Sequence, residues 1–114
     1  MRALRRGHEV LAEMQLDLSL PPACRAQAQR LAQEHPSPQE LVQWVQAGQP
    51  GLPSQWADAL VATYELFKRT QRRSEGSEQT QSALLFTLRH YPDVATTRLM
   101  ASDLGFWVWL ALER

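Results

Sequence analysis

The sequence predicts an all-α fold, a compact single-domain bundle of five to six short helices over residues 1–114, from three observations. The chain has no Ile or Asn and is rich in Leu, Ala, Gln, Glu and Arg, which favours helix over strand. Apolar and polar residues nowhere alternate strictly over six positions, as a half-buried strand would require. Prolines and cap residues divide the chain into segments of helical length.

The first three predicted helices lie between clear start and stop residues. The first runs from about Arg2 to Leu16 and the second from Ala23 to Glu34, after a proline pair and before His35-Pro36. Ser37 and Glu40 have capping-box spacing with a proline at the first helical position, and they predict a third helix that closes at Gly48.

Three further helices are predicted in the second half. Ser54 is expected to cap the fourth helix, whose apolar stripe has helical spacing and ends before a mobile loop near residues 72–77. The fifth runs from Glu78 to Tyr91, and Asp93 caps a sixth that runs from Val94 to near the end. The side chains expected to face the core in the fourth and fifth helices are Trp56, Leu60, Tyr64, Phe67, Leu84, Leu85, Leu88 and Tyr91.

Composition limits the classes of function. Twelve Lys+Arg balance twelve Asp+Glu, which argues against a dedicated polyanion binder, so nucleic acid is not the expected partner. No apolar run approaches the roughly 18–20 residues of a membrane span, and no membrane association is expected. Glu9 and Glu13 interrupt the segment where a signal peptide needs an apolar core, and Cys24 is the single cysteine. Both features predict a cytoplasmic protein.

Residue patterns for catalysis, metals and cofactors are missing. His8, His35 and His90 lie far apart in sequence, and none has a second histidine one helical turn away. The glycines form no phosphate-binding loop, and Cys24 has no nearby base in the sequence. We therefore expect a protein that is not an enzyme and has no metal or cofactor.

One basic cluster stands out in the otherwise neutral chain. Lys68, Arg69, Arg72 and Arg73 follow the apolar stripe of the fourth predicted helix. They would suit a phosphate or an acidic partner surface. Equally, cations at a helix C-terminus are what the helix macrodipole favours.

The segment from Thr97 to Phe106 resembles the first half of a helix-turn-helix, with Ala101, Leu104 and Gly105 at the expected places. A recognition helix must then offer polar side chains to base edges, whereas this chain continues with Trp and Val. A DNA-associated regulator using a degenerate helix-turn-helix at residues 97–114 is therefore the alternative function. A continuous buried helix is the favoured interpretation.

The C-terminal segment carries the main functional prediction. Phe106, Trp107, Trp109 and Leu110 belong to a run that is apolar on every side of a helix. Positions two apart on a helix point about 200° from each other, so Trp107 and Trp109 cannot both face one core. A stripe that begins at Met100 places Trp107 inward, which leaves Trp109 as the leading candidate for partner contact. A bundle that wraps this helix completely is the other interpretation.

Two stretches of the chain share a layout: each is a helix that ends in His and Pro and is followed by a cap residue. These are residues 28–37 and 82–93. The similarity is explained either by an internal duplication or by the fact that a helix, a proline stop and a cap residue are the commonest way to build a bend between helices.

A pattern of short matches runs over the first third of the chain: Arg2-Ala3-Leu4, Glu9-Val10-Leu11, Leu20-Pro21, Arg25, Ala28, Leu31 and His35-Pro36. In this pattern the chain resembles a family of short proteobacterial proteins of unknown function. The chain departs from the family pattern Leu-Arg-His-Tyr-Pro at residues 32–36, and a closer copy stands at residues 88–92. The resemblance implies a small helical bacterial protein, and the family has no known activity or site residues to carry over to this chain.

These observations favour a non-enzymatic protein–protein interaction module, a regulator, inhibitor or small subunit of a larger assembly. Its expected partner is another protein or a second copy of the chain. Eleven Arg against one Lys indicate a GC-rich coding genome, hence a bacterium or its phage. An enzyme of unknown class is the third alternative.

Overall fold

Six α-helices make up the part of the chain that the structure describes, residues 2–48 and 51–102 of a computed structural model. The helices are α1 (Arg2–Gln15), α2 (Pro22–Glu34), α3 (Pro38–Ala47), α4 (Ser54–Arg72), α5 (Glu78–Leu88) and α6 (Val94–Met100). No strand occurs within these residues. The predicted all-α bundle is confirmed.

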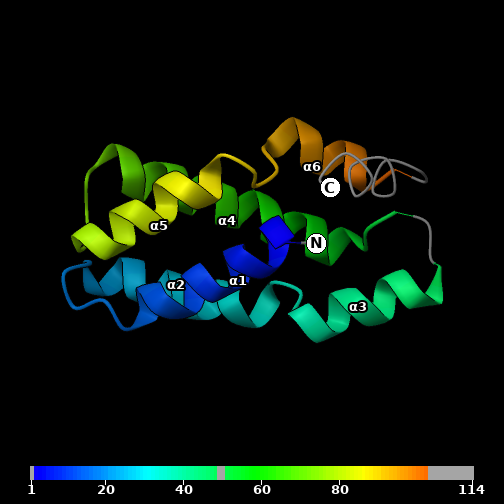
Figure 1. Ribbon diagram of the computed structural model, residues 1–114, viewed down its shortest axis with the longest axis horizontal. Helices are drawn as coiled ribbons and strands as arrows, with labels where there is room; N and C mark the ends of the chain where they lie inside the picture. The colour runs from blue at the N-terminus through cyan, green and yellow to red at the C-terminus, as the bar shows by residue number, and fades with distance from the viewer. Residues whose placement is uncertain (1, 49–50, 103–114) are drawn as a thin grey trace.

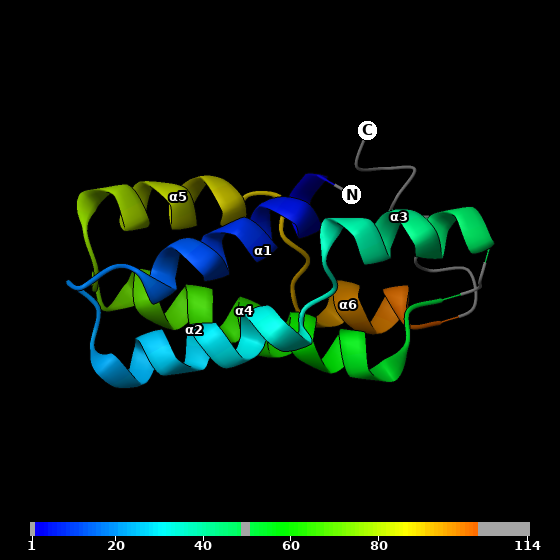
Figure 2. The same ribbon diagram turned by 90° about the horizontal axis from the view of Figure 1, so that it is seen from below.

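Four helices form a ring in which each packs against two others. α1 contacts α2 and α5, and α4 contacts the same two helices from the opposite side. Figure 1 shows α1, α2 and α3 in one layer and α4, α5 and α6 in the other. Figure 2, turned by 90°, shows α1 running beside α5. α3 and α6 extend one end of this bundle, where α3 contacts α1 and α6 contacts α4.

The core between the helices includes the apolar stripe predicted for the fourth helix and buried apolar residues of α1. Leu4, Leu11, Leu60 and Phe67 are fully buried, and Trp56 is partly buried against the same cluster. Full burial of one such side chain stabilises the fold by roughly 1.5–3 kcal/mol.

Local capping residues set several helix ends as predicted. The backbone N–H of Glu40 donates to Ser37 Oγ at 3.1 Å, and the Ser37 N–H donates to Glu40 Oε1 at 3.0 Å, which completes the capping box. Gly48 closes α3 with a left-handed φ of 66°. The Asp93 carboxylate accepts from the Thr96 N–H at 2.8 Å and begins α6.

Two predictions about α4 and α5 are wrong. Ser54 does not cap α4, because the helix already begins at Ser54 and the residue before it is Pro53, whose carbonyl accepts from the N–H of Ala57 at 3.0 Å. Leu85 does not face the core and is 53% exposed. The buried face of α5 is formed by Thr80, Ala83, Leu84 and Thr87, and at about 100° per residue Leu85 lies on the opposite side of the helix.

Two helices end earlier than predicted. α5 ends at Leu88, and Tyr91 follows the helix yet is buried. The helix that begins at Val94 ends at Met100, where the Met100 carbonyl accepts from the Leu52 N–H at 3.1 Å. Residues 103–114 lie outside the described part of the chain.

The turn between α4 and α5 packs against the turn that follows α1. Gly76 has a φ of 90°, and a Cβ there would lie 2.9 Å from Leu20 Cδ2 and 3.0 Å from Asp17 Oδ2. The N–H of Ser77 donates to the same Asp17 carboxylate at 2.9 Å. The predicted mobility of residues 72–77 stays a prediction.

Candidate functional site

A groove of about 550 Å³ lies between the N-terminal half of α1 and the C-terminal half of α5. The two helices run antiparallel, because Asp17 after α1 contacts Ser77 before α5 while Gly7 near the start of α1 contacts Tyr91 after α5. The groove is lined by Arg2, Ala3, Arg5, Arg6, Glu9, Phe86, Thr87 and His90. Volumes of this size are typical of ligand and peptide sites.

The α1 side of the groove is basic at the start of the helix. Arg2 and Arg5 are exposed, Arg6 is half-buried, and no acidic residue occupies the first turn. The positive end of the helix macrodipole disfavours cations at this position. Since helix stability does not account for Arg2 and Arg5, their placement favours an interaction with negative charge.

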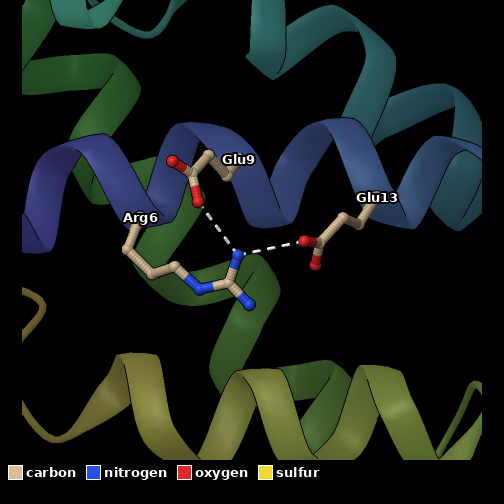
Figure 3. A network of polar contacts seen from close by, with 3 residues as sticks. All are labelled: Arg6, Glu9 and Glu13. Carbon is tan, nitrogen blue, oxygen red and sulfur yellow. Dashed lines mark hydrogen bonds and ion pairs between the residues drawn. The ribbon is translucent and has the colours of Figure 1, made fainter.

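Arg6 is held by two carboxylates of its own helix, as Figure 3 shows. Its Nη1 donates to Glu9 Oε2 at 3.1 Å and to Glu13 Oε1 at 3.0 Å. Partial burial acts to lower the pKa of Arg6, but the hydrogen bonds to Glu13 and Glu9 outweigh it and raise that pKa above its ordinary value. All three side chains remain well hydrated, so these pairs contribute little to folding stability.

The α5 side of the groove carries an exposed aromatic ring. Phe86 is 61% exposed and packs edge-on against the His90 ring at a centroid distance of 6.5 Å. The Thr87 hydroxyl on the same side of the groove is buried, with no hydrogen-bond partner among the described residues. Aromatic and arginine side chains together are the composition typical of protein interface hot spots.

The opposite end of the α1–α5 face is acidic. A second hollow of about 470 Å³ there is lined by Glu13, Leu16, Asp17 and Leu18 together with Ser77, Gln79 and Thr80. Leu16 and Leu18 are each 82% exposed. Burial acts to raise the pKa of Asp17, but the hydrogen bonds from the Ser77 N–H, the Thr80 hydroxyl and the Ser19 N–H lower it to about 2. Asp17 is therefore a carboxylate at all physiological pH values.

The predicted basic cluster lies at the C-terminal end of α4, away from this groove. Arg69 Nη2 donates to Gln27 Oε1 of α2 at 2.7 Å, so Arg69 joins two helices of the bundle. Arg72 and Arg73 are exposed, and Lys68 is half-buried. The predicted contacts of Lys68, Arg69, Arg72 and Arg73 with phosphate or an acidic partner stay predictions.

The predicted partner-binding residues Phe106, Trp107, Trp109 and Leu110 lie outside the described residues. Of the helix-turn-helix segment at 97–114, the structure describes only the end of α6 and the two residues after it.

The fold brings together two of the histidines that are scattered in sequence. The rings of His8 and His35 lie 5.7 Å apart, and His35 is 1% exposed. His90 lines the groove instead. Within the described residues, no group of three or more His, Cys, Asp or Glu side chains could hold a metal ion. Cys24 is half-buried with its Sγ 3.8 Å from Thr70 Oγ1.

The sequence interpretation missed the α1–α5 groove. Its signals were present locally: three arginines in residues 2–6 without an acid, and the four consecutive apolar residues 83–86, which at about 100° per residue cannot all face one core. Identifying the groove also required knowing that α1 and α5 are neighbours, which neither segment reveals alone.

Comparisons with known proteins give no relative. No family model, no curated protein and no solved structure matches the chain. None of the described helices is long and apolar enough to span a membrane.

Proposed function

We propose that the chain is a non-enzymatic protein–protein interaction module that docks a partner segment in the α1–α5 groove. The observation that carries the proposal is Phe86, which is 61% exposed inside a groove whose rim holds Arg2 and Arg5. A partner segment with one apolar side chain and nearby carboxylates would cover Phe86 and pair with these arginines.

The module is further proposed to be a cytoplasmic protein of a bacterium or its phage, acting as a regulator, an inhibitor or a small subunit of an assembly. The codon bias behind eleven arginines and the family resemblance of the first third support this origin. The single Cys24 supports a reducing compartment.

The groove suits a protein segment better than the polyanion of the alternative function. Glu9 lies on the groove wall and Glu13 is hydrogen-bonded to the same Arg6, so part of the positive charge is already neutralised. In addition, the zero net charge of the chain provides no long-range attraction for DNA.

The proposal is tested by selecting binders from a random displayed peptide library against the whole chain. Selected peptides should combine acidic residues with an apolar anchor. Their affinity should fall at least about tenfold with Phe86→Ala, since hot-spot truncation removes more than about 1.4 kcal/mol of binding free energy.

Leu85→Ala is the matched control, because Leu85 is the adjacent residue, is 53% exposed and does not line the groove. It should leave peptide affinity unchanged. Equal effects of Leu85→Ala and Phe86→Ala, or a library that yields no peptide dependent on Phe86, would overturn the proposal.

A further inference from the structure

Four charged residues form a stripe along the outer face of α1. Arg2, Arg6, Glu9 and Glu13 are separated by four, three and four residues. At about 100° per residue, this spacing confines all four to an arc of about 60° on the helix. Three of them line the α1–α5 groove, and the fourth, Glu13, lines the hollow at its acidic end.

The stripe is antisymmetric in charge about its own midpoint, between residues 7 and 8. Its N-terminal half carries two cations and its C-terminal half carries two anions at mirrored positions. Consider a twofold axis that is perpendicular to α1, level with that midpoint and in the plane of the interface. It would set a second α1 antiparallel to the first, face to face. It would then place Arg2 opposite the partner's Glu13 and Arg6 opposite the partner's Glu9, and each contact would occur twice.

The neighbouring helix α5 adds an apolar contact and no opposing charge. Its groove-lining residues are Phe86, Thr87 and His90, which face the middle and the N-terminal half of the stripe. A second copy seated across the stripe would cover the exposed Phe86 ring, whose burial supplies the apolar contribution that exposed ion pairs lack.

From this arrangement we infer that the occupant of the α1–α5 face is a second copy of the chain, held in an antiparallel, twofold-symmetric dimer through α1. The inference rests on the proposed function of this face as a docking surface, and it names the partner. The stripe needs no separate acidic partner, because each stripe provides the complement of the other; Arg5, which also lines the groove, has Val10 at its mirrored position and gains no ion pair.

The contact area sets the strength of this dimer. The fourteen residues of α1 rise about 21 Å, and a face two helices wide spans about 20 Å. The face therefore covers roughly 400 Å², well below the roughly 800 Å² per partner of a standard stable interface. The dimer is therefore weak, concentration-dependent and in exchange with the monomer.

In the single chain, Arg6 already pairs with Glu9 and Glu13 of its own helix. Dimerisation exchanges these exposed pairs for pairs of the same kind. Arg2, which forms no ion pair with any described carboxylate, gains one with the partner's Glu13. The net stabilisation of the dimer therefore comes from the new ion pair of Arg2 and from the burial of Phe86, since neither contribution is present in the monomer.

Sedimentation equilibrium of the whole chain over about 10 μM to 1 mM tests the inference, because interfaces of this size give weak complexes. The weight-average mass should rise from 13.0 kDa toward twice that value. Raising the salt to 1 M, where the Debye length is about 3 Å, should return it to the monomer mass.

A charge-reversal pair identifies the face. The double variant Arg2→Glu/Arg6→Glu carries only acids in the stripe, and Glu9→Arg/Glu13→Arg carries only arginines, so each should remain monomeric on its own. Mixed in equal amounts, the two should associate at least as tightly as the unmodified chain. All four positions are exposed or half-exposed, and circular dichroism should confirm folded helix in both variants. Arg30→Glu, an exposed reversal on α2, is the control and should dimerise normally.

A chain that stays monomeric at 1 mM, or a dimer indifferent to both reversals, overturns the inference. Peptide binding that depends on Phe86 would in either case still support the proposed function. Loss of both self-association and peptide selection would overturn the two together.

Discussion

The hydroxyl of Tyr91 donates a hydrogen bond to Nε2 of His35 at 2.9 Å, across 56 residues of sequence. On the other side of the ring, His35 Nδ1 lies 2.9 Å from the Pro36 carbonyl oxygen, which can only accept, so Nδ1 carries the proton. Burial lowers the pKa of His35 to about 4, so the imidazole is neutral near pH 7, Nε2 accepts from the Tyr91 hydroxyl, and both ring nitrogens are satisfied. The two stretches that share a His-Pro layout in the sequence meet at this contact.

The neutral His35 makes folding stability depend on pH. Burial lowers the pKa of His35 from 6.5 to about 4; the Pro36 hydrogen bond opposes this shift and the charge of His8 adds to it. Below pH 6.5 the unfolded chain binds a proton that the folded chain does not bind until about pH 4, so the free energy of unfolding falls as the pH is lowered through this window. The expected loss is roughly 3 kcal/mol, measured by urea unfolding at a series of pH values.

Two variants separate this effect from the rest of the acid response. His35→Gln removes the titration and should flatten the pH dependence between 6.5 and 4, whatever it does to stability at neutral pH. His90→Gln changes an exposed ring and should leave the slope as it is. A slope that persists in His35→Gln would assign the effect to other groups.

The lack of a side chain at Gly7 leaves room for the Tyr91 ring in the core. A Cβ on Gly7 would lie 2.3 Å from Tyr91 Cε2, and the ring cannot retreat because it also packs edge-on against Phe67 at 5.5 Å. Gly7→Ala should therefore destabilise the fold by roughly 1–3 kcal/mol in urea unfolding, although alanine is the better helix former.

Replacing Tyr91 isolates the cause of that cost. In a Tyr91→Leu background the ring is gone, and the same Gly7→Ala change should become neutral or stabilising. If the cost of Gly7→Ala is the same in both backgrounds, the close approach to Tyr91 is not its origin.

Local residues were sufficient to predict most of the helices, whereas contacts between distant segments were not predictable from them. Ser37 and Glu40 cap the start of α3 and Gly48 its end through contacts within one helical turn, so both helix ends can be predicted from the local sequence. Tyr91 fits the spacing of the α5 stripe, but its inward position depends on Gly7 and His35, which lie more than 50 residues earlier. The groove was missed for the same reason, because it exists only once α1 and α5 pack together.

Asp17 connects the turn after α1 to the start of α5. Its carboxylate accepts from the Ser77 N–H at 2.9 Å and from the Thr80 hydroxyl at 2.5 Å. Asp17→Ala should cost about 1–2 kcal/mol of folding stability and speed amide hydrogen exchange in the first turn of α5, since a lost cap has an effect of this size. Because the folded pKa is about 2 against an ordinary 3.8, this contribution is complete above pH 3.8 and is lost as the pH falls through about 2.

Asp93→Ala provides the comparison, because Asp93 caps α6 and makes no contact with the Asp17 turn. It should leave hydrogen exchange in α5 unchanged. Unchanged exchange in Asp17→Ala as well would show that Ser77 alone, through its side chain, fixes the start of α5.

The basic residues at the end of α4 give a prediction about DNA. Arg69 Nη2 already donates a hydrogen bond to Gln27 Oε1 at 2.7 Å. In addition, the chain has no net charge that would attract a polyanion over a distance. Mobility-shift titration with random duplex DNA at physiological salt should therefore show no complex tighter than about 10 μM, the range of non-specific binding, and Arg72→Ala/Arg73→Ala should change nothing. A tight complex whose affinity falls steeply with salt and disappears in the double variant would instead favour the DNA-associated alternative, with these two exposed arginines as its phosphate contacts.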